Sequence, residues 1–169
     1  MRIFSMNRYK KVMIAAATVL TLSTTMVGCS AAKEDASPKK TEQTQTDLGK
    51  KKVIADIEMT PKNFTYKQDD TFNEKGNELT VIPMHIANKT KSEFGVGAGD
   101  FHLETADGKK IDTFGYHDSF GDVIPAGKTL DGNAYFAIPK NGKNYTLVYH
   151  PTNAAKERTL KWTIGSPKK

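Results

Sequence analysis

The sequence contains a single cysteine, Cys29, among its 169 residues. A chain with one thiol forms no internal disulfide, so any folded part must be held together by a packed hydrophobic core. Arginine is also scarce, because Arg158 is the only one after residue 28. Arginine is the side chain that pairs with phosphates and base edges through two hydrogen bonds at once. Its scarcity leads us to expect no nucleic-acid partner.

The region expected to fold lacks an excess of charge of either sign. The formal net charge of the chain is +6. Residues 1–28 carry four basic and no acidic side chains, whereas residues 53–169 carry 15 of each sign. The basic character therefore belongs to the N-terminal segments, and the charge pattern does not indicate a surface for an anionic polymer.

Motifs that carry catalytic chemistry are missing as well. The sequence has no G-x-S-x-G, no HExxH and no phosphate-binding glycine loop followed by a helix. The four histidines do not fall at metal-ligand spacings, and the acidic pairs Asp69 with Asp70 and Asp118 with Asp122 lack the calcium-loop pattern. We therefore expect no catalytic residue, no metal and no cofactor other than covalent lipid, in a protein that is not an enzyme.

What the N-terminus does contain is an export signal. A basic segment, residues 1–11, is followed by an uncharged apolar run, residues 12–27, and then by Gly28 and Cys29. This order is typical of a secretory signal. The run of 16 residues is shorter than the roughly 20 apolar residues that a membrane-spanning helix needs.

The last four residues of this region, Met26-Val27-Gly28-Cys29, resemble the lipobox of bacterial lipoproteins. The resemblance implies cleavage between Gly28 and Cys29, a thioether from the Cys29 sulfur to diacylglycerol, and an N-acyl chain such as palmitate. Each buried methylene of these chains contributes about 0.8 kcal/mol to membrane binding. We expect Cys29 to hold the protein in the lipid bilayer, at the outer face of the cytoplasmic membrane of a Gram-positive bacterium.

Composition divides the chain into four parts. Residues 1–28 are the lipoprotein signal peptide. Residues 29–52 comprise the lipidated cysteine and a flexible linker, because this polar stretch has too few apolar side chains to bury. Residues 53–165 are the folded domain, and residues 166–169 are a short frayed tail.

The folded region alternates between short apolar runs and turn-forming residues. Runs with a period of two, bounded by proline, glycine, asparagine or aspartate, are typical of β-strands. They lie at residues 53–59, 79–87, 101–103, 109–113, 134–138, 145–149 and 160–164. Seven or eight such strands predict an all-β fold, an antiparallel immunoglobulin-like β-sandwich, with a small barrel as the alternative. Pro83 predicts an edge position or a bulge for the second strand.

Five short motifs occur in order along this region. They are NKT at 88–90, DFHLETADGKK at 100–110, IPAGK at 124–128, FAIPK at 136–140 and YTLVY at 145–149. Together they resemble a family of immunoglobulin-like domains in lipoproteins of Gram-positive bacteria, a domain of unknown function related in fold to a secreted mycobacterial antigen. The resemblance covers residues 53–164. It implies the sandwich and an exported setting, and it supplies no catalytic residues.

The segment at residues 114–124 is the candidate contact site. It places aromatic side chains in a glycine-containing stretch between a hairpin and a proline turn. Sandwich domains use such connections to present aromatic side chains to partners. We therefore predict Tyr116, His117 and Phe120 as partner contacts. The alternative is that two of the three rings of Phe114, Tyr116 and Phe120 pack beneath the segment and complete the core.

These observations favour a non-enzymatic binding or interaction module whose partner is an envelope, wall or host protein. The alternative is a lipoprotein that binds a small solute or a metal for an envelope system. A wall hydrolase would require His117, Asp118 and Asp122 to converge in one pocket.

Overall fold

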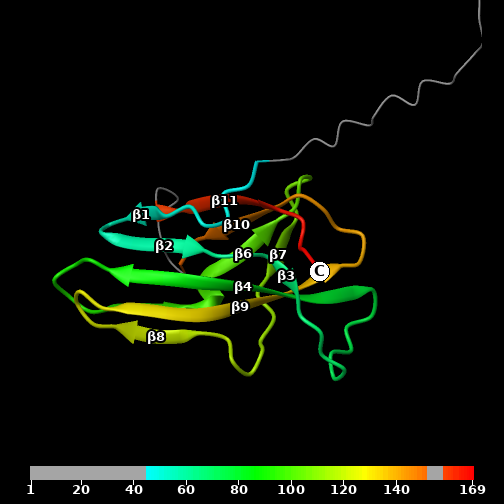
Figure 1. Cartoon of the computed structure of the whole chain (residues 1–169), viewed down its shortest axis with the longest axis horizontal. Helices are drawn as coiled ribbons and strands as arrows, with labels where there is room; N and C mark the ends of the chain where they lie inside the picture. Colours follow the sequence, from blue (N-terminus) through cyan, green and yellow to red (C-terminus); the bar gives the residue numbers. More distant parts are fainter. Residues whose placement is uncertain (1–44, 152–157) are drawn as a thin grey trace, which may run out of the picture. The chain divides into compact units, whose positions relative to one another are not determined.

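The computed structural model describes residues 45–151 and 158–169, which form a β-sandwich (Figure 1). Its elements in chain order are β1 (Lys52–Ile54), β2 (Ile57–Pro61), β3 (Thr65–Tyr66), β4 (Asn77–Asn88), β5 (Phe94–Gly97), the 3-10 turn η1 (Ala98–Asp100), β6 (Phe101–Glu104), β7 (Lys110–Asp112), β8 (Gly121–Ile124), β9 (Thr129–Pro139), β10 (Tyr145–Tyr149) and β11 (Leu160–Gly165). None of the described residues belongs to a helix long and apolar enough to cross a bilayer.

Two antiparallel sheets make up the sandwich. The first has the order β1-β2-β4-β9, and β3 pairs with β4 beyond the end of β2. The second has the order β11-β10-β6-β7, and a ribbon of β5 and β8 completes the structure. Figure 1 shows the two longest strands of the first sheet, β4 and β9, running side by side.

The core lies between the sheets and follows the period of two that strands impose on their side chains. On β4, Ile82, Met84 and Ile86 are buried, and on β11 the same holds for Trp162 and Ile164. Burial of such side chains contributes about 1.5–3 kcal/mol each and is the main force that holds the sheets together.

The predicted antiparallel β-sandwich is therefore confirmed. The described residues contain eleven strands rather than seven or eight. The difference arises because residues 53–59 form two strands, β1 and β2, and because β3, β5 and β8 were not predicted as strands. These three have only two to four residues each and leave too little alternation to be recognised in a sequence.

Residues 53–59, predicted as one strand, are a hairpin. β1 and β2 pair antiparallel with Ile54 opposite Ile57. The two residues between them, Ala55 and Asp56, have φ angles of 47° and 60°. Two consecutive left-handed residues form the tight turn whose twist matches that of the strands. Such turns usually contain Asn-Gly or Asp-Gly, so Ala-Asp carries no turn signal and the apolar alternation continues through it.

Pro83 lies on a central strand, so the prediction of an edge position or bulge was wrong. β4 pairs with β9 on one side, where Pro83 lies opposite Asn133. On the other side the Pro83 carbonyl accepts a hydrogen bond of 2.9 Å from the Lys62 amide, in the gap between β2 and β3. A proline lacks the amide donor that a continuous neighbour would need. The interruption is in the neighbouring strand rather than in β4 itself.

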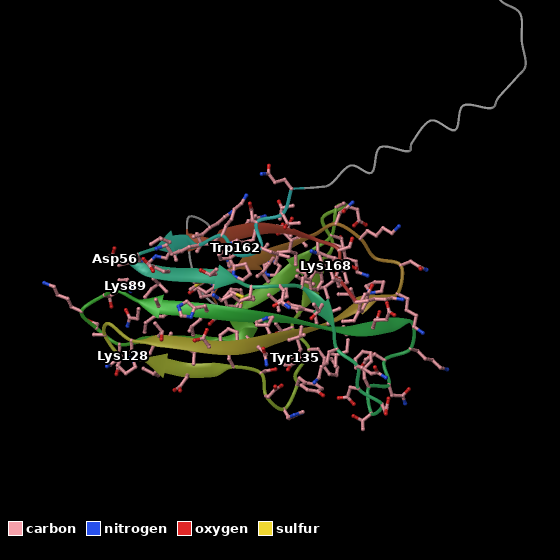
Figure 2. The ribbon with its side chains drawn as sticks, viewed as in Figure 1. Asp56, Lys89, Lys128, Tyr135, Trp162 and Lys168 are labelled. Atoms are coloured by element: carbon pink, nitrogen blue, oxygen red, sulfur yellow. The ribbon has the colours of Figure 1, made fainter. Side chains whose placement is uncertain are left out.

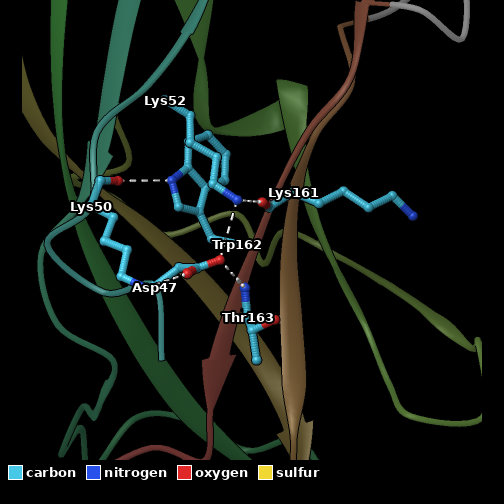
Figure 3. Close-up of polar contacts among 6 residues, drawn as sticks. All are labelled: Asp47, Lys50, Lys52, Lys161, Trp162 and Thr163. Atoms are coloured by element: carbon cyan, nitrogen blue, oxygen red, sulfur yellow. Dashed lines mark hydrogen bonds and ion pairs between the residues drawn. The ribbon is translucent and has the colours of Figure 1, made fainter. Parts of the chain in front are cut away.

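The folded domain begins before residue 53, so the predicted linker boundary was also wrong. The Asp47 amide donates to the Thr163 carbonyl at 2.6 Å, and the Gly49 amide donates to Pro61 at 2.7 Å. Trp162 Nε1 donates to the Lys50 carbonyl at 3.0 Å (Figure 3). We call residues 47–52 the N-terminal clamp. It was missed because backbone groups and one distant tryptophan hold most of it, and Leu48 is the one apolar side chain that it packs against the core. Residues 1–44 lie outside the described residues.

The C-terminal residues 166–169 were predicted to fray, and the structure contradicts this. The Lys168 amide donates to the Phe64 carbonyl at 2.9 Å, and the Tyr66 amide donates to the Lys168 carbonyl at 3.1 Å. Lys168 thereby forms a parallel bridge with Thr65 of β3. The end of β3 offers unpaired backbone groups, and the tail satisfies them.

Candidate functional site

The predicted lipidation and cleavage residues, Cys29 and Gly28, lie outside the described residues. The predicted contact segment is fully described, and its three candidate residues differ in how far they are buried. Phe120 is buried, with 9% of its surface exposed. Tyr116 is half-buried and His117 is exposed.

Phe120 belongs to the core, so its prediction as a partner contact was wrong. Its ring packs edge-on against Phe101, with ring centroids 5.9 Å apart. Its backbone amide donates to the Asn133 carbonyl of β9 at 3.1 Å. Gly132 leaves room for the ring, because a Cβ at that position would lie 2.3 Å from Phe120 Cβ. The glycine at position 132 of β9 is the sequence signal that a large side chain, that of Phe120, packs over it.

Tyr116 is held in place by contacts with other side chains. Its ring centroid is 4.4 Å from that of Tyr135 on β9 and 4.4 Å from that of His117. Its hydroxyl donates to Asp69, from the loop between β3 and β4. The Tyr135 hydroxyl donates to Asp118 at 2.9 Å. We call these five residues the aromatic loop cluster.

The pKa values of the cluster reflect these hydrogen bonds. The Thr71 hydroxyl and then the Tyr116 hydroxyl stabilise the Asp69 carboxylate and lower its pKa to about 2. The same bond to Asp69 raises the pKa of Tyr116 to about 12. Burial, followed by the bond to Asp118, raises the pKa of Tyr135 to about 12. Both phenols therefore keep their protons and remain donors at neutral pH, which makes the cluster a fixed arrangement rather than a set of acids and bases.

A second ring pair joins the same two loops. Phe72 and Phe114 pack edge-on with ring centroids 5.4 Å apart. The Phe114 amide also donates to the Tyr135 carbonyl at 2.8 Å. The sequence analysis missed Asp69 and Phe72, because no local pattern links the β3–β4 loop to the segment 40 or so residues further on. Only the pairing of β4 with β9 brings them together.

His117, Asp118 and Asp122 do not converge on one pocket. Asp118 bonds to Tyr135 and, at 3.3 Å, to Asn133. Asp122 lies on β8, where its carboxylate accepts from the neighbouring Val123 amide. No group of three or more potential metal ligands occurs among the described residues. The arrangement required for a wall hydrolase is not present.

A cavity of about 600 Å³ lies at another part of the domain. Its walls come from the β1–β2 turn, the β4–β5 loop and the end of β10. Figure 2 shows Asp56 and Lys89, which belong to the first two of these segments, at the end of the sandwich away from Tyr135. The cavity is therefore separate from the aromatic loop cluster.

Solved structures share this fold. The ycdA protein of Bacillus subtilis, described as a candidate lipoprotein, matches with a TM-score of 0.55 and 22% identity over 68% of this chain and 38% of its own. The secreted protein MPT63 of Mycobacterium tuberculosis matches with a TM-score of 0.54 and 15% identity over 69% and 93%. The yjhA protein of Bacillus subtilis matches with a TM-score of 0.51 and 17% identity over 68% and 94%.

At these identities the likeness establishes the fold, and the chain spans 38% of the ycdA protein's length. The predicted relation in fold to a secreted mycobacterial antigen is confirmed. A search of curated protein sequences finds no match. A family model, described as Domain of unknown function (DUF4352), matches residues 46–159, which span nearly the whole sandwich. The chain belongs to the DUF4352 family.

Proposed function

We propose that this protein is a lipid-anchored extracytoplasmic lipoprotein and a non-enzymatic binding module, which presents the aromatic loop cluster to an envelope, wall or host protein. The observation that carries the proposal is the series of three tilted rings, in which His117 contacts Tyr116 and Tyr116 contacts Tyr135, with His117 exposed and Tyr135 buried.

This series of rings suits a contact surface because the rings are ordered before a partner binds. Asp69 and Asp118 hold the two tyrosine hydroxyls, so little side-chain entropy remains to be lost when a partner binds. Large, rigid rings with few rotatable bonds are the side chains that contribute most to protein interfaces. The carboxylates around the rings favour a partner with basic or amide groups at the rim of the contact.

The lipobox-like residues support the anchoring part of the proposal. Fifteen residues, 30–44, separate Cys29 from the first described residue. A chain of that length reaches at most about 50 Å when fully extended. The domain would therefore act within the first layers of the envelope above the membrane.

The direct test is capture from envelope and wall fractions with residues 41–169, which form a compact unit with a complete core. We expect His117→Ala, alone and with Tyr116→Ala, to reduce retention of any specific partner at least fivefold. His117 is exposed, so its loss should leave the melting temperature unchanged.

Tyr66→Ala is the matched control, because Tyr66 is also a half-buried aromatic residue but lies on β3. A partner that is retained equally by the wild-type protein and by both cluster variants would overturn the role of the cluster. Failure to retain any partner above an unrelated sandwich domain would count against the binding module itself.

A further inference from the structure

We propose that the cavity between the β1–β2 turn, the β4–β5 loop and the end of β10 binds a small zwitterion with an apolar body, of the amino acid or dipeptide class. This goes beyond the proposed function, because it assigns a second and separate site with a different kind of ligand. In this site Arg158 and the Tyr149 hydroxyl would receive the carboxylate, and Asp100 would receive the ammonium group.

The size and floor of the cavity suit such a ligand. Its volume of about 600 Å³ lies within the range of small-molecule sites. Ile57 and Tyr149 form a buried floor, and Ile54 and Phe94 are half-buried at its sides. An apolar side chain placed here would be removed from water, which favours binding in proportion to the area covered.

Charges of both signs line this apolar floor. Arg158, the only arginine after residue 28, is one of the lining residues, together with Asp100 and Glu93. No ion pair joins Arg158 to any residue that the structure describes. Asp100 is fixed in place, because its Oδ2 accepts from the Gly97 amide at 2.9 Å and its carbonyl accepts from the His150 amide at 2.8 Å.

The Tyr149 hydroxyl adds an open hydrogen-bonding position. The side chain is 4% exposed and packs against Phe101, with ring centroids 5.1 Å apart. Among the described residues no side-chain or backbone group hydrogen-bonds to its hydroxyl. Burial and the nearby Asp100 raise its pKa to about 12, against a smaller effect of Arg158. The hydroxyl is thus a protonated donor, and the charges of both Asp100 and Arg158 affect its pKa.

The walls of the cavity are fixed before any ligand enters. The Lys89 amide donates to the Asp56 carbonyl at 2.9 Å and joins the β1–β2 turn to the β4–β5 loop. The buried Asn88 side chain donates to the Ser92 and Ile124 carbonyls at 2.7 and 2.8 Å, and accepts from the Thr90 amide at 3.0 Å. Such preorganisation lowers the entropic cost of binding.

The charge pattern selects among ligand classes. A simple anion would meet two carboxylates, Glu93 and Asp100, beside the one guanidinium. A simple cation would leave Arg158 without a partner, and a wholly apolar ligand would pair with neither sign of charge. A zwitterion pairs with both signs at once and covers the apolar floor, so it is the class that this lining discriminates for.

The test is calorimetric titration of residues 41–169 with alanine, leucine and phenylalanine of either hand and with their homodipeptides, followed by the single-charge analogues 3-phenylpropionate and phenethylamine. We expect at least one zwitterion to bind saturably with a dissociation constant below about 10 mM, which corresponds to weak but specific binding. Both single-charge analogues should bind at least fivefold more weakly. Arg158→Gln and Asp100→Asn should each weaken binding tenfold or more, and Tyr149→Phe should weaken it severalfold.

Lys143→Gln is the control, since it removes one exposed charge in the turn between β9 and β10, outside the cavity lining, and should leave the titration unchanged. Far-ultraviolet circular dichroism and the melting temperature establish that each variant is folded. Zwitterion binding that is unaffected by Arg158→Gln and Asp100→Asn would overturn the proposal, as would the absence of saturation by every probe. Because envelope capture by the aromatic loop cluster is measured separately, either proposal can fail without the other.

Discussion

At the scale of single residues, Gly132 shows how one absent side chain allows another to be buried. Phe120 occupies the space above it, and an added Cβ would lie 2.3 Å from Phe120 Cβ and 3.0 Å from its Cγ. The Cβ of Phe120 is fixed by the backbone, so rotation of the side chain does not relieve this contact. The position of Phe120 in the core, rather than at a contact surface, therefore depends on this glycine.

We expect Gly132→Ala to lower the free energy of unfolding by about 2 kcal/mol or more, as overpacking does. Chemical denaturation measures this. Gly95→Ala is the control, because a Cβ there meets no atom within 4 Å. A double variant that also carries Phe120→Ala should not recover the loss, because alanine keeps the Cβ atom that lies 2.3 Å away. Equal stability of Gly132→Ala and wild type would show that β9 can shift away from the ring.

Tyr145 carries a polar atom for which the described residues offer no partner. Its hydroxyl is buried without a hydrogen bond, and burial raises the pKa of the phenol. Its ring packs edge-on against Phe64, with centroids 5.8 Å apart, and phenylalanine would preserve this contact. We expect Tyr145→Phe to raise the free energy of unfolding by about 1 kcal/mol, because an unpaired hydroxyl is costly to bury.

Tyr135→Phe is the matched comparison, since it removes the bond from the Tyr135 hydroxyl to Asp118 and should be destabilising. Thermal melts of the two variants side by side decide the matter. A larger loss for Tyr145→Phe than for Tyr135→Phe would mean that the Tyr145 hydroxyl does have a partner in solution.

At the scale of elements, the β1–β2 hairpin combines a favourable turn geometry with unfavourable residues. Ala55 and Asp56 both adopt positive φ, which costs a non-glycine residue about 1 kcal/mol or more. Replacing the pair by Asn-Gly supplies the residues that this turn prefers. We expect a gain of about 1 kcal/mol in the free energy of unfolding, measured by denaturant titration. A loss would mean that the Asp56 side chain makes a contact that compensates for the strain.

The N-terminal clamp gives the protein a dependence on acid. The hydrogen bond from Lys50 contributes most to lowering the pKa of Asp47 to about 2, followed by Lys52 and the Thr163 amide, while burial acts in the opposite direction. Figure 3 shows these contacts around the Asp47 carboxylate. The folded-state pKa is below the ordinary 3.8, so the stabilisation is complete above about pH 4 and is lost as pH falls toward 2.

We expect Asp47→Asn to cost about 1 kcal/mol at pH 7, after allowance for partial exposure, and almost nothing at pH 2. Denaturant titrations of both proteins at the two pH values measure the difference. Glu58→Gln is a suitable control, because Glu58 forms a comparable pair with Lys51 that does not hold the clamp to β11. A constant difference between wild type and Asp47→Asn across this range would contradict the assignment.

The sequence predicts those elements whose burial alternates and misses those that are held by other means. The alternation on β4, β9, β10 and β11 follows from burial of one face, so these strands are recovered with the fold class. The clamp is held by backbone groups, by Trp162 and by the single apolar side chain of Leu48. The tail is held by the backbone of Phe64 and Tyr66. The composition of the two segments gives little indication of these contacts. The aromatic loop cluster was half recovered. Tyr116 and His117 are aromatic residues in a turn-rich segment, but Asp69 reaches them only through long-range strand pairing.

At the scale of the whole molecule, the N-terminal clamp and the aromatic loop cluster lie apart. Figure 2 shows Trp162 and Tyr135 on different sides of the domain. Trp162 hydrogen-bonds to the N-terminal clamp, and Tyr135 belongs to the aromatic loop cluster. A tether that enters at the clamp would leave the aromatic loop cluster accessible from the side away from the attachment point.

We expect Cys29→Ser to release the protein from the membrane, because the thiol would no longer carry diacylglycerol. Fractionation of producing cells, with immunodetection in membrane and soluble fractions, measures this. Ser30→Ala should remain with the membrane. Sedimentation of Cys29→Ser with membranes after a high-salt wash would contradict lipid anchoring through this residue.

The clamp also has a mechanical consequence. Asp47 bonds to Thr163 on β11 of one sheet, and Gly49 bonds to Pro61 on β2 of the other. A pull transmitted along the tether is therefore divided between both layers before it reaches β1. Drag on the domain would load the sandwich as a unit instead of peeling away its edge strand, which suits a fold that has no disulfide to resist such forces.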